Sequence, residues 1–253
     1  MTVPPPDEHF KGKSVVEHLR EARTRGAMAS AEIHGTEMPG QFAALADALK
    51  EMSVALLLLW VVFSHFFSFN STWLYLLLFS AGWVIWKTAR SALLGWARIE
   101  RLHRVIEEER WEIEHHRAQE KQELTEMYEA KGLTGKLLEE VIDVLMADDN
   151  RLLRVMLEEE LGLTLEAYEH PLKQAFGALC GSFVSAGVCL IGFWALPSLG
   201  LPILAAAVVA ASTTVSAKLE RNRVWKTIVW NLAIAGLTAG SVYFLIASLR
   251  VPQ

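Results

Sequence analysis

Five apolar runs limit what this chain can fold into. They cover residues 53–69, 73–89, 175–196, 201–217 and 227–249. Each run approaches the length of about 20 residues that a helix needs to cross the hydrocarbon core of a bilayer. Hydrophobic residues make up 52% of the chain, more than a soluble domain usually carries. Because they are gathered in blocks, the sequence predicts an all-α membrane protein with five transmembrane helices.

Polar sequence between the runs divides the chain into four predicted parts. These are an N-terminal segment (1–41), transmembrane helices one and two (42–90), a helical insert (91–171) and transmembrane helices three to five (172–253). The first transmembrane helix is expected to begin near Gln41, because the stretch that follows contains no helix breaker.

The charges of the loops orient the predicted spans. Lysine and arginine occur in the N-terminal segment, in the insert and in the loop 218–226, whereas the two remaining loops carry no charge. Cytoplasmic loops of membrane proteins carry the excess of lysine and arginine. We therefore expect the N-terminus and the 91–171 insert in the cytoplasm, and the C-terminus on the opposite side.

Two spans contain glycines four residues apart, at Gly177 and Gly181 and at Gly236 and Gly240. This spacing lets helix backbones approach closely in lipid. Packing within the helix bundle is the first interpretation of both pairs, and a seam between two subunits is the alternative.

Composition and isolated residues exclude several other functions. A formal net charge of −5 disfavours nucleic-acid binding. Cys180 and Cys189 lie in an apolar run without CxxC spacing, which indicates buried thiols and not a disulfide or metal site. His65 lies in an aromatic-rich span, where a packed, hydrogen-bonded histidine is more usual than a proton relay or a ligand. The sequence contains no phosphate-binding glycine loop, and we expect no enzymatic activity.

The insert is predicted to be helical. One helix is expected to leave the second span, cover 73–130 without a break and stop at Gly132. Two more are expected over 135–147 and from an N-cap at 149 or 150 to Gly162.

The first of these insert helices carries an acidic stripe. With about 100° between successive residues, five side chains lie within about 80° on an unbroken helix: Glu109, Glu112, His116, Glu120 and Glu123. Stacked carboxylates repel one another, and a divalent cation turns this repulsion into attraction. Carboxylates and imidazole suit Mn²⁺, Fe²⁺ or Zn²⁺. On spacing alone, a plain solvated or coiled-coil face is the more frequent explanation.

The third insert helix adds a second candidate set, since Met156 and Glu160 are four residues apart and share a face. Taken alone, a methionine on a helix is usually core and a glutamate run is usually solvated. The stretch EIEH, with Glu112 and His115, matches the Glu-x-x-His motif of di-iron bundles. Such bundles need a second copy and two further glutamates, so ferritin-like oxidation receives little support.

Taken together, these features resemble the vacuolar iron transporter family of divalent-metal exporters. The resemblance rests on the Glu-x-x-Glu pairs of ERWE and EKQE and on the stretches LTEMYEAKGL and VIDVLMADDNRLLRVMLEEELGL. It also rests on five spans with a helical insert between the second and the third. It is strongest from 107 to 171, and it implies a dimer in which the insert captures ions before the membrane pathway.

The resemblance implies a set of metal ligands: Glu109, Glu112, Glu120, Glu123, Met156 and Glu160. His116, from the acidic stripe, is an additional candidate. A second methionine of the family falls at Leu157, which cannot coordinate a metal. With the resemblance, metal binding is favoured over a solvated face.

The membrane part departs from the family pattern. The family has an aspartate in its first span, for which this sequence offers Asp47 with Glu51 nearby. The family's second-span glutamate has no counterpart, and SAGWVIW (80–86) stands where it is expected. An acid inside a span points to function, whereas a helix end projecting into the cytoplasm leaves both acids hydrated. These two interpretations stay open.

The resemblance implies a transporter that exports Fe²⁺ or Mn²⁺ from the cytoplasm, in exchange for protons, with Zn²⁺ as a further candidate ion. The expected partners are the lipid bilayer and a second copy of the chain. A membrane-anchored metal-binding or regulatory protein that no longer transports is the alternative, supported by the missing second-span acid. A scaffold whose insert docks a partner is the third hypothesis.

Overall fold

The computed structural model describes residues 14–30, 39–163 and 170–249, and within these ranges it consists of helices and short connections, with no strand. The helical fold class predicted from the sequence is confirmed. The chain forms two compact units: unit 1 is Met1–Ala31 with Ala97–Tyr168, and unit 2 is Glu32–Trp96 with Glu169–Gln253. Each unit has its own apolar core.

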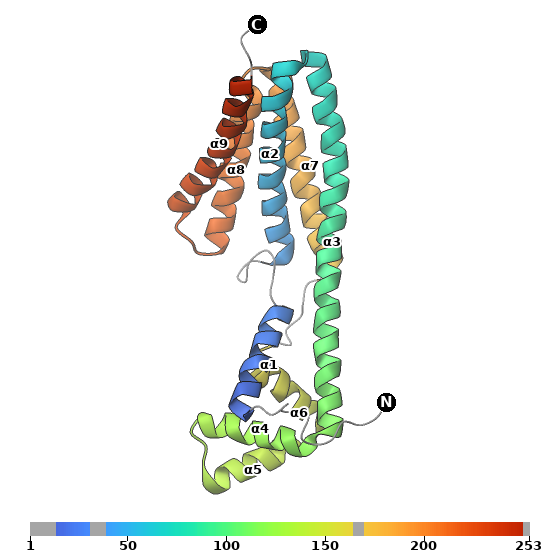
Figure 1. Cartoon of the computed structure of the whole chain (residues 1–253), viewed down its shortest axis with the longest axis vertical. Coiled ribbons are helices and arrows are strands. Elements are labelled where there is room, and N and C mark those ends of the chain that lie inside the picture. Colours follow the sequence, from blue (N-terminus) through green and yellow to red (C-terminus); the bar gives the residue numbers. More distant parts are fainter. Residues whose placement is uncertain (1–13, 31–38, 164–169, 250–253) are drawn as a thin grey trace. The chain divides into compact units, whose positions relative to one another are not determined.

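Unit 2 is a bundle of long helices (Figure 1). Its elements are α2 (Gly40–Phe66), the first part of α3 (Phe69–His115), α7 (Pro171–Ala195), α8 (Gly200–Leu219) and α9 (Val224–Leu249). α2 packs against α7, α8 and α9, and α8 packs against both α7 and α9. The start of α2 at Gly40 confirms that the first helix begins well before the apolar run.

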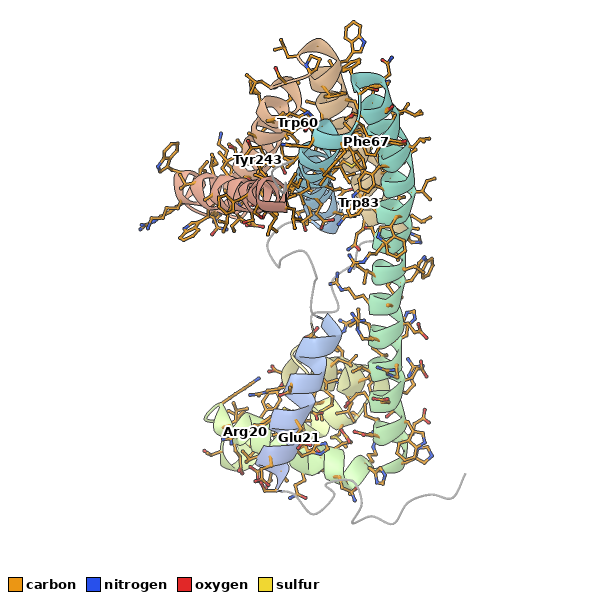
Figure 2. All side chains as sticks on the ribbon, turned by 45° about the horizontal axis from the view of Figure 1, so that its top comes forward. Arg20, Glu21, Trp60, Phe67, Trp83 and Tyr243 are labelled. Carbon is orange, nitrogen blue, oxygen red and sulfur yellow. The ribbon has the colours of Figure 1, made fainter. Side chains whose placement is uncertain are left out.

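Three helices in the described part of unit 2 are long and apolar enough to cross a membrane, namely α7, α8 and α9. Leu56 and Leu76 lie in the apolar core of the unit, and Trp60 and Trp83, labelled in Figure 2, pack against it. Large apolar side chains also cover the outside of the bundle, such as Trp225 of α9, which is 76% exposed. A bilayer is the environment in which such a surface is stable.

Buried hydroxyl groups join α2 to its neighbours. The Oγ atoms of Ser53 on α2 and Ser185 on α7 lie 2.8 Å apart. Ser212 of α8 donates a hydrogen bond to the carbonyl oxygen of Ala46 at 2.8 Å. A polar side chain among apolar helices gains from a partner on the next helix, so these bonds favour the observed alignment of the three helices.

The backbones of α2 and α7 approach closely at Gly177 and Gly181. A Cβ atom on either glycine would collide with a backbone carbonyl oxygen of α2. Packing within the bundle is therefore confirmed for this pair. On α9, a Cβ atom on Gly236 or Gly240 would meet no atom within 4 Å, so that pair makes no close approach inside the described part of the chain.

Replacing Gly181 by alanine is expected to lower the free energy of unfolding by about 1–3 kcal/mol, because the added methyl group forces α2 and α7 apart. Gly187 of α7 is the matched control, since a Cβ atom there meets nothing within 4 Å. Gly187→Ala is expected to be neutral or slightly stabilising. Thermal unfolding in detergent compares the two variants, and equal midpoints would show that the close approach does not stabilise the bundle.

Unit 1 gathers shorter helices around one apolar core (Figure 1). Its elements are α1 (Val15–Ser30), the last part of α3, α4 (Arg117–Ala130), α5 (Gly135–Met146), α6 (Asp149–Val155) and the π-helical turn η2 (Met156–Glu160). Buried side chains from these elements form the core: Leu19, Leu102, Leu124, Ile142, Leu152 and Leu157 among them. Of the predicted N-terminal segment 1–41, residues 1–13 and 31–38 lie outside the described residues.

The predicted unbroken helix over 73–130 is wrong, because the helix is interrupted at His116. α3 ends at His115 and α4 begins at Arg117, with φ −126° and ψ 34° at the residue between them. The acidic side chains therefore lie on two helices, and the single stripe expected on one helix does not exist.

The other helix boundaries of the insert lie close to the predicted ones. Gly132 and Gly162 follow helix ends with φ of 94° and 64°, a left-handed conformation that glycine adopts without strain. The N-cap of α6 is Asp148, whose carboxylate accepts a hydrogen bond from the backbone N–H of Arg151 at 2.8 Å. The predicted cap at 149 or 150 is therefore wrong by one or two positions.

Candidate metal centre

Three segments of unit 1 bring carboxylates together. α3 carries Glu109, α4 carries Glu120 and η2 carries Glu160, and one oxygen of each lies within 4.8 Å of the others. On an unbroken helix, the first two would be separated along the axis by 11 residues (120 − 109), or about 16 Å. The interruption at His116 is therefore what allows these two glutamates to meet.

A second triad adjoins the first. His18 Nε2 of α1 lies 3.8 Å from Oε1 of Glu123 and 3.9 Å from Oε1 of Glu160. These three residues also offer donor atoms within 4.8 Å of one another. Since Glu160 belongs to both triads, they form one cluster. His18 is not among the residues predicted from the sequence, where the N-terminal segment is taken only as polar.

The carboxyl groups of the cluster are shielded from water. Glu109, Glu120, Glu123 and Glu160 are 4%, 0%, 1% and 2% exposed. Burial raises the pKa of Glu120 to about 11, with a further contribution from the neighbouring carboxylates. At neutral pH this residue therefore carries a proton in the metal-free protein. A cation that displaces the proton would compensate the negative charge that remains.

Metal binding is expected to tighten as the pH rises from about 5 to about 8. The pKa of Glu120 lies above this whole range, so an ion must displace a proton at every point within it, and affinity rises up to about tenfold per pH unit. Titration calorimetry with Mn²⁺ in buffers of different ionisation enthalpy counts the released protons. An affinity that does not change with pH, with no proton released, would contradict the predicted protonation.

Two further predicted ligands lie around the triads. Glu112 is half-buried and lines a pocket of about 20 Å³ with Glu109 and Glu160, room for about one water-sized group. Met156 is 0% exposed in the core of unit 1, at the start of the π-helical turn that ends in Glu160. Such turns occur frequently at functional sites. The structure thus brings the predicted glutamates together, while coordination by the methionine sulfur stays a prediction.

His116, the additional candidate from the acidic stripe, lies at the break between α3 and α4. It is 5% exposed, and its ring packs edge-on against Trp111 with 5.4 Å between the ring centroids. Neither of the two triads in the described part of the chain includes it. Coordination by its imidazole ring stays a prediction.

In unit 2, both acids predicted for the membrane pathway are paired with lysines. Lys50 Nζ lies 2.9 Å from Oδ1 of Asp47, and Lys87 Nζ donates to Oε2 of Glu51 at 2.6 Å. The Lys87 side chain is 5% exposed, against 47% for Glu51. Lys87 is not among the residues predicted from the sequence, although it directly follows the stretch 80–86, where the family's second-span acid is expected.

His65 has the packed environment that the sequence favours. Its Nδ1 lies 2.7 Å from the carbonyl oxygen of Val61. Its ring packs against Tyr243 of α9, labelled in Figure 2, with 5.4 Å between centroids. These contacts explain the position of the His65 side chain without a bound metal.

Long apolar helices in one unit and a buried carboxylate and imidazole cluster in the other define a helical membrane protein with a candidate cation site. A profile of the VIT family matches residues 97–247, more than half of the chain. The chain therefore belongs to the VIT family, the vacuolar iron transporter family that its motifs indicate. Membership indicates membrane metal-ion transport in general. Neither the curated proteins nor the solved structures gave a match.

Proposed function

We propose that the chain exports Fe²⁺ or Mn²⁺ from the cytoplasm and that the carboxylate cluster of unit 1 collects the ion. The observation that carries this proposal is the convergence of buried carboxylates from α3, α4 and η2 in a chain of the VIT family. Oxygen donors with an imidazole beside them suit these ions. The proposed ligands are Glu109, Glu112, Glu120, Glu123, Met156 and Glu160.

The proposed topology has five transmembrane helices. α7, α8 and α9 are candidate spans, and α2 packs against all three, which supports placing it in the same bilayer. The first part of α3 is proposed as the remaining span: Phe69 stacks on Phe193 of α7 at 5.0 Å, and Leu78 and Trp86 are 60% and 61% exposed. The distribution of lysine and arginine supports a cytoplasmic N-terminus and insert and an external C-terminus. A homodimer in the bilayer is the proposed assembly.

The proposed membrane pathway starts at Asp47 and Glu51 of α2. A groove of about 410 Å³ beside this helix is lined by Lys50, Glu51, Asn231 and Thr238 together with apolar side chains. Ionisable groups among apolar spans mark ion pathways in many transporters. We propose that the ion passes from the cluster to these acids and that protons move in the opposite direction.

Uptake of metal into vesicles containing the full-length protein tests this function. We expect Mn²⁺ and Fe²⁺ to enter, faster with a proton gradient, and Asp47→Ala to abolish the uptake. Asp143→Ala is the matched control, because Asp143 is an exposed acid of α5 that pairs with Lys121. If Asp47→Ala transports as well as the wild type, the proposed pathway is wrong. If the wild type takes up neither ion, transport itself is wrong.

The Lys87–Glu51 pair supports a second candidate function, a membrane-anchored metal-binding or regulatory protein that no longer transports. The positive charge of a lysine that is paired with a pathway acid repels a cation that approaches this acid. Under this hypothesis the full-length protein binds Mn²⁺ at the cluster, but vesicles containing it accumulate none. Titrating the same preparation with Mn²⁺ first shows that the ion binds. The uptake assay on that preparation then separates the two functions.

A further inference from the structure

One face of α1 is buried in unit 1. Val15, Leu19 and Ala22 are 8%, 9% and 0% exposed and belong to the apolar core of the unit. Their spacing of four and seven residues from the first is that of one helix face. α1 contacts α4 and η2, the segments that carry Glu123 and Glu160. Because rotating the helix would expose this apolar face, the core fixes which side chains of α1 point inward.

His18 lies on the same face of α1 and is 7% exposed. Its Nε2 atom is 3.8 Å from a Glu123 oxygen and 3.9 Å from a Glu160 oxygen. A direct hydrogen bond would bring nitrogen and oxygen to about 2.7–3.2 Å. Two ligands that are each about 2.1 Å from one ion lie about 3.0–4.2 Å apart, depending on the angle between them. Both observed distances from His18 Nε2 fall within this range, so they fit donors that share an ion.

We propose that His18 is a nitrogen ligand of a divalent ion shared with Glu123 and Glu160. This site rests on the proposed metal-binding function and adds a donor from α1, a helix outside the motifs that indicate the family. Imidazole favours transition-metal ions over Mg²⁺ and Ca²⁺, which prefer oxygen ligands. The bound ion also tethers α1 to α4 and η2, so that metal binding and the docking of α1 stabilise each other.

Pulsed electron paramagnetic resonance with Mn²⁺ alone tests this ligand in the full-length protein in detergent. A nitrogen bound directly to Mn²⁺ modulates the electron spin echo, and ¹⁵N labelling of the histidines changes the modulation. We expect the wild type to show nitrogen modulation that changes on ¹⁵N-histidine labelling. In His18→Gln the modulation is expected to disappear, with Mn²⁺ affinity lowered about tenfold.

Two control variants assign the signal. Arg20, labelled on α1 in Figure 2, is exposed, and Arg20→Gln is expected to keep the modulation. His103→Gln is expected to keep it as well, because His103 is an exposed histidine of α3 that belongs to neither triad. The labelling experiment on the wild type needs no variant to fold.

The outcomes separate the ligand from the proposed function. Two outcomes would overturn the role of His18 alone, provided that Mn²⁺ binding still depends on Glu160. In the first, the bound Mn²⁺ shows no histidine nitrogen. In the second, the histidine nitrogen persists in His18→Gln. If the wild type binds no Mn²⁺, both the proposed function and this ligand fail.

Discussion

Replacing Glu160 by glutamine is expected to weaken Mn²⁺ binding by at least about 100-fold. Glu160 belongs to both triads, so the substitution removes a charged ligand from each. Glutamine keeps the volume of the side chain and removes one of several buried negative charges, so the metal-free protein is expected to be as stable as the wild type or more stable. Titration calorimetry measures the affinity, and thermal unfolding without metal measures the stability.

Glu158→Gln is the matched control, because Glu158 lies on the same π-helical turn and is exposed. It is expected to bind Mn²⁺ as the wild type does. Wild-type affinity in Glu160→Gln would show that the triads do not bind the ion. An equal loss in both variants would show that Mn²⁺ is attracted only by the general negative charge of the insert.

Replacing Glu51 by glutamine is expected to destabilise unit 2 by about 2 kcal/mol, because it leaves the buried ammonium of Lys87 without its counter-charge. The reverse change, Lys87→Met, is expected to cost less. It leaves an acid that is 47% exposed and can bind water in the groove. Thermal unfolding in detergent gives the order of stability, with the wild type above Lys87→Met and Lys87→Met above Glu51→Gln.

The double variant Glu51→Gln with Lys87→Met completes this comparison. Both charges are then absent, so its stability is expected to approach that of the wild type. The loss of stability in the double variant is therefore expected to be much smaller than the sum of the losses in the two single variants. Additive losses would show that the two side chains do not interact in the folded protein. If Lys87→Met, which keeps the pathway acid Glu51, gains Mn²⁺ uptake in vesicles, the lysine blocks the pathway, whereas unchanged uptake would contradict that role.

The identities of the clustered glutamates were predictable, but their geometry was not. Glu109 and Glu120 belong to Glu-x-x-Glu pairs that the sequence displays directly. Their convergence depends on the helix break at His116. The sequence there contains neither proline nor glycine, the residues that usually mark a break in a helix. Packing in the core of unit 1 has to outweigh the local helical preference of this stretch. Helix propensity alone therefore does not predict the break.

The two unpredicted residues, His18 and Lys87, were missed for a related reason. His18 meets Glu123 and Glu160 through the docking of α1, a contact between segments far apart in sequence. Lys87 reaches an acid 36 residues away on another helix. Sequence periodicity assigns a side chain to a face of its own helix, but it does not say which helix that face meets. The apolar spacing of Val15, Leu19 and Ala22 is the one signal that marks α1 as a docked helix.

Anomalous diffraction from crystals of the full-length protein grown with saturating Mn²⁺ tests the convergence of the carboxylates most directly. We predict a manganese peak between the carboxylates of Glu109, Glu120 and Glu160, with oxygen ligands at about 2.1–2.2 Å. Manganese peaks only elsewhere, or no peak within reach of these three side chains, would contradict a metal centre at the cluster.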